Sequence, residues 1–110
     1  MDDGSLLHLT VAEHDGATEV VLDGELDLSC VEALSTALRG AIAARPSIVV
    51  VDAAHLSYMD STGIKCLVTA ARACDAAGTR LVVRNARGIV LRVMQLTGVD
   101  ETLLERVQSR

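Results

Sequence analysis

The sequence predicts a single α/β domain in which a small mixed β-sheet is layered with helices, in the order β-β-α-β-α-β-α. Two patterns predict this class. Short runs of valine, isoleucine and leucine alternate along the chain with segments whose apolar residues recur every three or four positions. The length of 110 residues suits one domain, and 50% of the residues are hydrophobic, which is enough to form an aliphatic core. We expect residues 1–4 to be a disordered tail and residues 5–110 to form the domain.

The first two strands are expected to form a β-hairpin. Apolar residues alternate with polar or small ones over residues 7–12, which is the period of a half-buried strand. The Asp15-Gly16 pair favours a turn, and residues 18–23 supply an antiparallel partner strand. Gly24 is expected to end this second strand.

The rest of the chain alternates between helix and strand. The first helix is expected over residues 29–45, with Asp27 or Ser29 as its cap, because apolar residues recur there at spacings of three and four. Residues 47–52 are β-branched without alternation, which favours a parallel strand covered on both faces. After a loop, the remaining elements are a helix from residue 60 to a stop at Gly78, a strand over 80–85, a helix over 89–97 and a final helix, favoured over a short strand, over 99–110.

Charge and composition exclude several function classes. Ten basic against fifteen acidic residues give a net charge of −5, which opposes nucleic-acid binding, and Tyr58 is the single aromatic residue. No apolar run approaches the roughly 18 residues of a membrane span. The N-terminal sequence MDDGSLLHL is acidic where a secretory signal is basic. We therefore expect a cytoplasmic protein that binds neither nucleic acid nor membrane.

The three cysteines are expected to be reduced thiols. Cys30, Cys66 and Cys74 form an odd set in a chain without a secretion signal. Neither they nor the histidines have the spacing of zinc ligands, so we expect no metal and no cofactor. A redox-responsive regulator is a weaker hypothesis, because thiols on apolar helix faces are usually inert.

The segment that carries chemistry is VVVDAAHLSYMDSTGIKCL, residues 49–67. Here a buried strand leads through a loop to a helix whose first residues are Asp60, Ser61, Thr62 and Gly63. Open α/β sheets place binding sites at such strand ends. Short polar side chains at a helix start are also what ordinary capping selects, so the spacing alone leaves both interpretations open.

Three motifs together resemble the STAS domain of anti-sigma factor antagonists, also called anti-anti-sigma factors. They are GELD at 24–27, YMDSTG at 58–63 and LTGVD at 96–100, and they span nearly the whole chain. The resemblance implies that Ser61 accepts a phosphate from an anti-sigma factor with serine kinase activity. It also implies that the unphosphorylated form binds this kinase and frees a sigma factor, and that a PP2C-type phosphatase restores that form.

The resemblance also implies a partner surface around Ser61. Asp27 is expected to lie on it, although a helix cap explains that residue equally well. Thr62 is the competing phosphate acceptor. Lys65 departs from the family pattern, which has a small residue there, and places a cation one turn from Ser61. It could contact the phosphate or be solvated, and the second interpretation is favoured. The predicted partner-binding residues are Asp27, Met59, Asp60, Ser61, Thr62, Gly63 and Lys65.

Two other function classes remain as alternatives. The sequence contains no GxSxG, P-loop, GxGxxG or HExxH motif, and Ser61 has no nearby histidine beyond His55, so we expect that the chain is not an enzyme. A constitutive STAS subunit of a lipid-transport ATPase or of a stress-signalling scaffold would share the fold. The intact Asp-Ser-Thr-Gly motif favours the phosphorylation switch.

Overall fold

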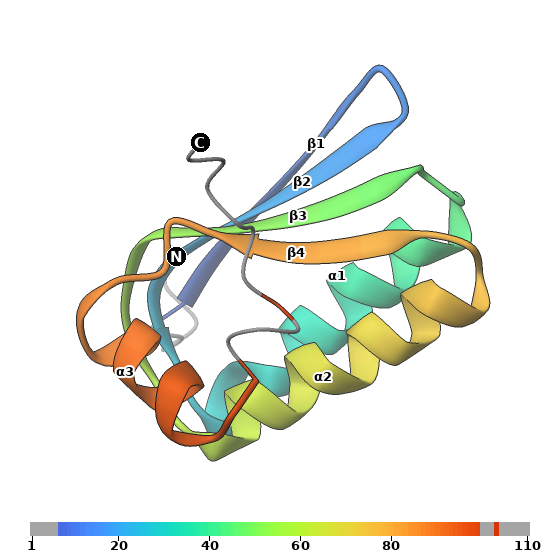
Figure 1. Cartoon of the computed structure of the whole chain (residues 1–110). Coiled ribbons are helices and arrows are strands. Elements are labelled where there is room, and N and C mark those ends of the chain that lie inside the picture. Colours follow the sequence, from blue (N-terminus) through green and yellow to red (C-terminus); the bar gives the residue numbers. More distant parts are fainter. Residues whose placement is uncertain (1–6, 100–102, 104–110) are drawn as a thin grey trace, which may run out of the picture.

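The sheet of the computed structural model, which describes residues 7–99 and 103, has four strands. β1 (Leu7–His14) pairs antiparallel with β2 (Ala17–Leu26), and β2 pairs parallel with β3 (Ile48–Met59), which pairs parallel with β4 (Arg80–Arg84). The strand order is therefore β1-β2-β3-β4. Figure 1 shows the β1–β2 hairpin at one side of the sheet, with its turn projecting away from the helices.

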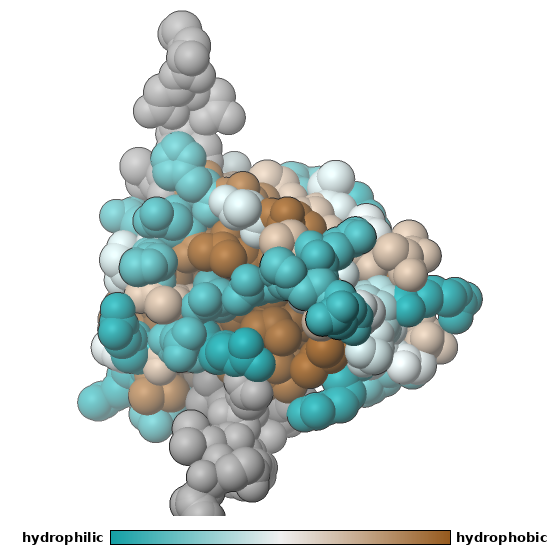
Figure 2. Space-filling view, turned by 90° about the horizontal axis from the view of Figure 1, so that it is seen from above, coloured by the Kyte–Doolittle hydropathy of each residue, from teal (hydrophilic) through white to brown (hydrophobic). Residues whose placement is uncertain are grey.

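The helices lie mainly on one face of the sheet. A short 3-10 turn, η1 (Leu28–Cys30), leads into α1 (Val31–Ala43), and α2 (Ser61–Ala76) packs beside α1 below the sheet (Figure 1). α3 (Gly88–Leu96) lies at the end of the molecule where α1 and α2 begin. Figure 2 looks from above, onto the side opposite α1 and α2, where apolar groups are bordered by hydrophilic ones. This order of elements confirms the predicted β-β-α-β-α-β-α arrangement.

The core is aliphatic, as the composition predicts. Strand and helix residues bury their side chains between the sheet and α1 and α2, and the largest fully buried side chains include Val20, Leu22, Leu26, Leu34, Leu38, Val49, Val51, Met59, Leu67 and Val83. Each fully buried side chain of this size contributes about 1.5–3 kcal/mol. Leu26 and Met59, the last residues of β2 and β3, belong to this core, so the ends of both strands are held in place by it.

The predicted hairpin turn is confirmed. Asp15 and Gly16 both adopt positive φ angles, 51° and 84°, which two-residue turns between right-handed twisted strands require. Gly16 meets this requirement without a side-chain clash, and aspartate tolerates it better than most residues.

The predicted end of β2 at Gly24 is wrong. The strand continues to Leu26, and Gly24 has a φ of 121° where the pairing register between β2 and β3 shifts. At both shifts the extra residue lies on β3, and the buried residues of β2 keep their period of two through Leu22 and Leu26. Gly24 is therefore an interior residue of β2 that lies opposite a bulged part of β3.

The predicted loop over residues 53–59 is also wrong, because β3 runs through it to Met59. Ala53, Leu56 and Met59 are buried at intervals of three rather than two, which conceals the strand in the sequence. The pairs Glu25↔Tyr58 and Leu26↔Met59 hold this extension against β2. As a consequence, α2 begins directly after the strand.

The remaining boundaries differ from the predictions by a few residues. α1 begins at Val31 rather than residue 29, because residues 28–30 form the 3-10 turn. Gly78 and Gly98 follow α2 and α3 with φ angles of 78°, which confirms both predicted stops. Most of the helix expected over 99–110, and the expected tail over 1–4, lie outside the described residues. Of the described residues in this region, Leu103 is buried, and its N–H donates to the carbonyl of Val99 at 3.0 Å.

Candidate functional site

The two polar motifs meet at one edge of the sheet. β2 and β3 are parallel neighbours, and the last residue of each, Leu26 and Met59, are paired in the register. Asp27 and Asp60 are the next residues along the chain, and each precedes a helical turn. The fold therefore brings the GELD and DSTG motifs together, as expected of parallel strand ends.

Asp60 caps α2. Its Oδ1 atom accepts hydrogen bonds from the backbone N–H of Thr62 at 3.0 Å and of Gly63 at 3.3 Å, and from the Thr62 hydroxyl. These bonds satisfy N–H groups that have no partner within the helix. The capping interpretation of this aspartate is therefore confirmed.

The hydroxyl of Ser61 is exposed at the start of this helix. Ser61 is the first residue of α2, its side chain is exposed, and its hydroxyl makes no hydrogen bond with any residue in the described part of the chain. Thr62 is half-buried, and its hydroxyl donates to Asp60. Of the two candidate acceptors, Ser61 is thus the accessible one.

Asp27 caps the turn at the end of β2. Its Oδ1 accepts from the Ser29 N–H at 2.9 Å and the Ser29 hydroxyl at 2.6 Å, and the Cys30 thiol closes a capping box by accepting from the Asp27 N–H at 3.4 Å. The hydrogen bonds from Ser29, first from its side chain and then from its backbone, lower the pKa of Asp27. A carboxylate is thus held ionised beside the Ser61 helix start.

Replacing Ser29 should raise the pKa of Asp27. The lowered native pKa means that the Asp27 carboxylate contributes stability above its ordinary value of 3.8, and that this stability is lost as the pH falls through the native pKa. In Ser29→Ala the side-chain donor is absent, so the midpoint of the Asp27 carboxyl titration, followed by NMR, should move upward. Ser35→Ala, which removes a hydroxyl bonded to Arg39, should leave that midpoint unchanged. Equal titration midpoints in the wild type, Ser29→Ala and Ser35→Ala would show that the Ser29 hydroxyl does not lower the pKa of Asp27.

Met59 and Gly63 lie below the surface. Met59 is 1% exposed and is the last buried residue of β3, so in the free domain its side chain belongs to the core and does not lie on the surface. A Cβ atom on Gly63 would lie 2.7 Å from Cγ of Met59 and 2.8 Å from Cδ2 of Leu26. Gly63 therefore permits the first turn of α2 to pack directly on the ends of β2 and β3.

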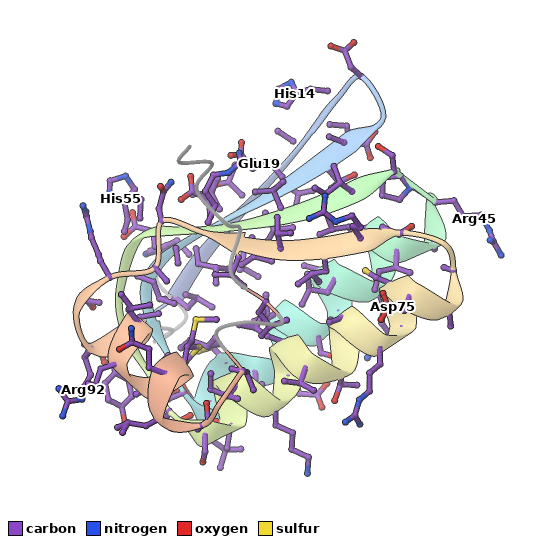
Figure 3. The ribbon with its side chains drawn as sticks, in the orientation of Figure 1. His14, Glu19, Arg45, His55, Asp75 and Arg92 are labelled. Carbon is purple, nitrogen blue, oxygen red and sulfur yellow. The ribbon has the colours of Figure 1, made fainter. Side chains whose placement is uncertain are left out.

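The elements at this end of the molecule carry exposed apolar side chains. Leu28 in η1 is 71% exposed, Tyr58 near the end of β3 41%, and Ile89 and Leu96 in α3 48% and 73%. Figure 3 shows Arg92 on α3 at this end and Asp75, near the C-terminal end of α2, toward the other. The sequence analysis missed the two leucines and Ile89. The available signals were a leucine directly after the capping Asp27 and apolar residues off the buried face of α3.

The residues of the predicted site therefore divide into three groups. Ser61 and Lys65 are exposed, while Asp27, Asp60 and Thr62 are half-buried caps or cap partners. Met59 and Gly63 are buried supports. Among the described residues, no group of three His, Cys, Asp or Glu side chains is arranged to hold a metal ion, and none of the helices there has the length and apolarity to cross a membrane.

Removing the Asp60 cap should destabilise the protein. Asp60→Ala leaves the N–H groups of Thr62 and Gly63 without their acceptor, and we expect a loss of about 0.5–2 kcal/mol in the free energy of unfolding. Asp60→Asn keeps an acceptor oxygen and should lose much less. Urea denaturation of the three proteins measures this, and equal losses for alanine and asparagine would show that the capping bonds do not matter.

Comparison with known proteins agrees with this geometry. The family described as "Mlab, STAS domain" matches residues 9–105. RsfB, an anti-sigma-F factor antagonist of Mycobacterium tuberculosis, is 33% identical over 95 residues, which cover 86% of this chain and 76% of RsfB. The crystal structure of an anti-sigma factor antagonist from Mycobacterium paratuberculosis matches with a TM-score of 0.81 at 31% identity, over 88% of this chain and 82% of that one.

A more distant structure shares the fold. The anti-sigma factor antagonist SpoIIAA in its unphosphorylated form matches with a TM-score of 0.79 at 22% identity, over 92% of this chain and 90% of that one. The four-stranded mixed sheet with its helices thus has the fold of an anti-sigma factor antagonist. The chain belongs to the STAS-domain family of anti-sigma factor antagonists.

Proposed function

We propose that this protein is an anti-sigma factor antagonist switched by phosphorylation of Ser61. In its unphosphorylated form it binds an anti-sigma factor of the serine kinase type and thereby frees a sigma factor. Phosphorylation by that kinase ends the complex, and a PP2C-type phosphatase restores the binding form. The proposed place of action is the cytoplasm, where sigma factors work.

The observation that carries this proposal is the state of the Ser61 hydroxyl. It is exposed at the start of α2 and makes no hydrogen bond to the described residues, and it lies between the capping residue Asp60 and Thr62, whose hydroxyl is bonded to Asp60. A kinase needs such an accessible hydroxyl. None of the described histidines or carboxylates accepts a hydrogen bond from Ser61, which supports a phosphate acceptor rather than an activated nucleophile.

Exposed apolar side chains supply a reason to bind a protein. Leu28, Tyr58, Ile89 and Leu96 are exposed, and η1, the end of β3 and α3, which carry them, lie at the end of the domain where α2 begins. Exposed apolar surface of this kind is typical of interaction sites. The relative RsfB is named for antagonism of an anti-sigma-F factor, and we propose the same class of partner here.

A phosphate on Ser61 is compatible with the fold but not with this interface. It adds about −1.5 to −2 charge, which the N–H groups and dipole at a helix start favour. On binding, however, that charge would be desolvated close to the carboxylates of Asp27 and Asp60. A penalty of about 3 kcal/mol weakens a complex more than a hundredfold. The switch therefore needs no refolding.

A pull-down tests the function. The unphosphorylated protein should retain an anti-sigma-F factor, ATP should release it, and mass mapping should find the phosphate on Ser61 and not on Thr62. A phosphate found only on Thr62, or retention unaffected by ATP, would refute the proposal. Stable copurification with a transport ATPase would favour the constitutive-subunit alternative.

A further inference from the structure

A groove of about 450 Å³ lies between α1 and α2, and it adjoins the Ser61 site, with which it shares Thr62 and Lys65. Both helices contribute apolar side chains to it, among them Val31 and Ile42 of α1 and Ala70 of α2. It is a surface groove rather than an enclosed cavity, so a segment of a partner protein can lie in it while the rest of that partner stays outside.

The groove is continuous with the Ser61 surface. Leu28, next to Asp27, and Thr62, next to Ser61, line one end of it, while Ala73 lies along its length on α2. From Thr62 to Ala73 the helix rises about 16 Å, at about 1.5 Å per residue. A protein docked on Ser61 can therefore reach along the groove without a break in the contact surface.

Two cations line the groove. Arg39 and Lys65 are both exposed, although the chain as a whole carries a net charge of −5. In the described part of the chain neither forms an ion pair, and Arg39 donates only to the hydroxyls of Ser35 at 2.8 Å and Thr36 at 3.5 Å. Glu32 lines the groove two turns before Arg39 on α1. An acidic side chain of a bound segment could therefore pair with Arg39 or Lys65. It would be repelled by Glu32, so the segment would bind in one orientation.

We infer that this α1–α2 groove is a second docking site for the anti-sigma factor. It takes an amphipathic segment of that partner, with apolar side chains between the helices and an acidic residue facing Arg39 and Lys65. This inference rests on the proposed function. It assigns part of the affinity to a surface that extends along α1 and α2 beyond the site of phosphorylation.

Cys66 is a native reporter of the groove. It lines the groove and is half-buried, whereas Cys30 and Cys74 are buried. Burial, with a smaller contribution from Glu32, raises the pKa of the Cys66 thiol, and Arg39 acts in the opposite direction. Its alkylation by iodoacetamide should therefore be slower than that of a free thiol near neutral pH and should increase with pH.

A charge reversal and a thiol footprint test the inference, with purified anti-sigma-F factor as the probe. Arg39→Glu should weaken binding at least tenfold at low salt, while Arg72→Glu, an exposed change on α2 outside the groove lining, should stay within twofold. In wild-type protein, complex formation should slow iodoacetamide labelling of Cys66 at least fivefold, read by mass mapping of its peptide.

The outcomes separate the two proposals. If Cys66 is labelled at the same rate in the free protein and in the complex, the groove is not a docking site, whatever Arg39→Glu does. Should Ser61→Glu still abolish binding in that case, the proposed function stands alone. If the unphosphorylated wild-type protein does not bind the anti-sigma-F factor at all, both proposals are overturned.

Discussion

Ser61→Glu is expected to lower the affinity for an anti-sigma-F factor by about a hundredfold while leaving the fold intact. The glutamate places a negative charge where the phosphate would sit, beside Asp27 and Asp60, on a surface that binding desolvates. At the N-terminus of α2 the same charge is tolerated or slightly favoured in the free protein. The effect should therefore fall on the complex and not on the free energy of unfolding.

Calorimetric titration of three proteins measures this effect. Ser61→Ala removes the acceptor without adding charge, so it should bind like the unphosphorylated wild type and should remain bound when ATP is added. Ser61→Glu should bind weakly with or without ATP. Matching affinities for the alanine and glutamate variants would refute the electrostatic account of the switch.

Gly63→Ala is expected to lower the free energy of unfolding by about 1–2 kcal/mol. The new methyl group would lie under 3.0 Å from the side chains of Met59 and Leu26, both fully buried, so either these side chains or the first turn of α2 must shift. Overpacking of this kind costs about 1–3 kcal/mol. The higher helix propensity of alanine returns at most about 1 kcal/mol.

Gly40→Ala is the matched control for this substitution. Gly40 lies in α1, and a Cβ atom there would meet nothing within 4 Å. The same chemical change should therefore raise the free energy of unfolding by about 0.5–1 kcal/mol. Denaturant unfolding of both variants gives the comparison. A stabilised Gly63→Ala protein would show that the close contact of α2 with β2 and β3 is absent in solution.

The order of elements could be predicted because each signal in it is local. The Asp15-Gly16 turn, the spacing of apolar residues in α1 and α2, and the stops at Gly78 and Gly98 all depend on a few neighbouring residues. The extension of β3 to Met59 could not be predicted in this way. It depends on pairing with β2 across register shifts, which belongs to the tertiary structure.

In the candidate site, too, some features depend on the local sequence and others on the tertiary structure. The capping role of Asp60 and the position of Ser61 at a helix start follow from residue types and spacing. The burial of Met59 does not, because it arises from the bulged end of β3 and from contact with a glycine on another element. The groove lined by Arg39 and Lys65 could not be predicted either, because its two sides belong to different helices, α1 and α2, which only the tertiary structure brings together.

The direct test of the central claim compares one protein in two covalent states. Wild-type protein is prepared without phosphate and with phosphate on Ser61, and each form is titrated into the same anti-sigma-F factor while its thermal unfolding is recorded separately. The account predicts at least a hundredfold weaker binding for the phosphorylated form and closely similar unfolding temperatures. Equal affinities, or binding lost only because the phosphorylated protein unfolds, would contradict it.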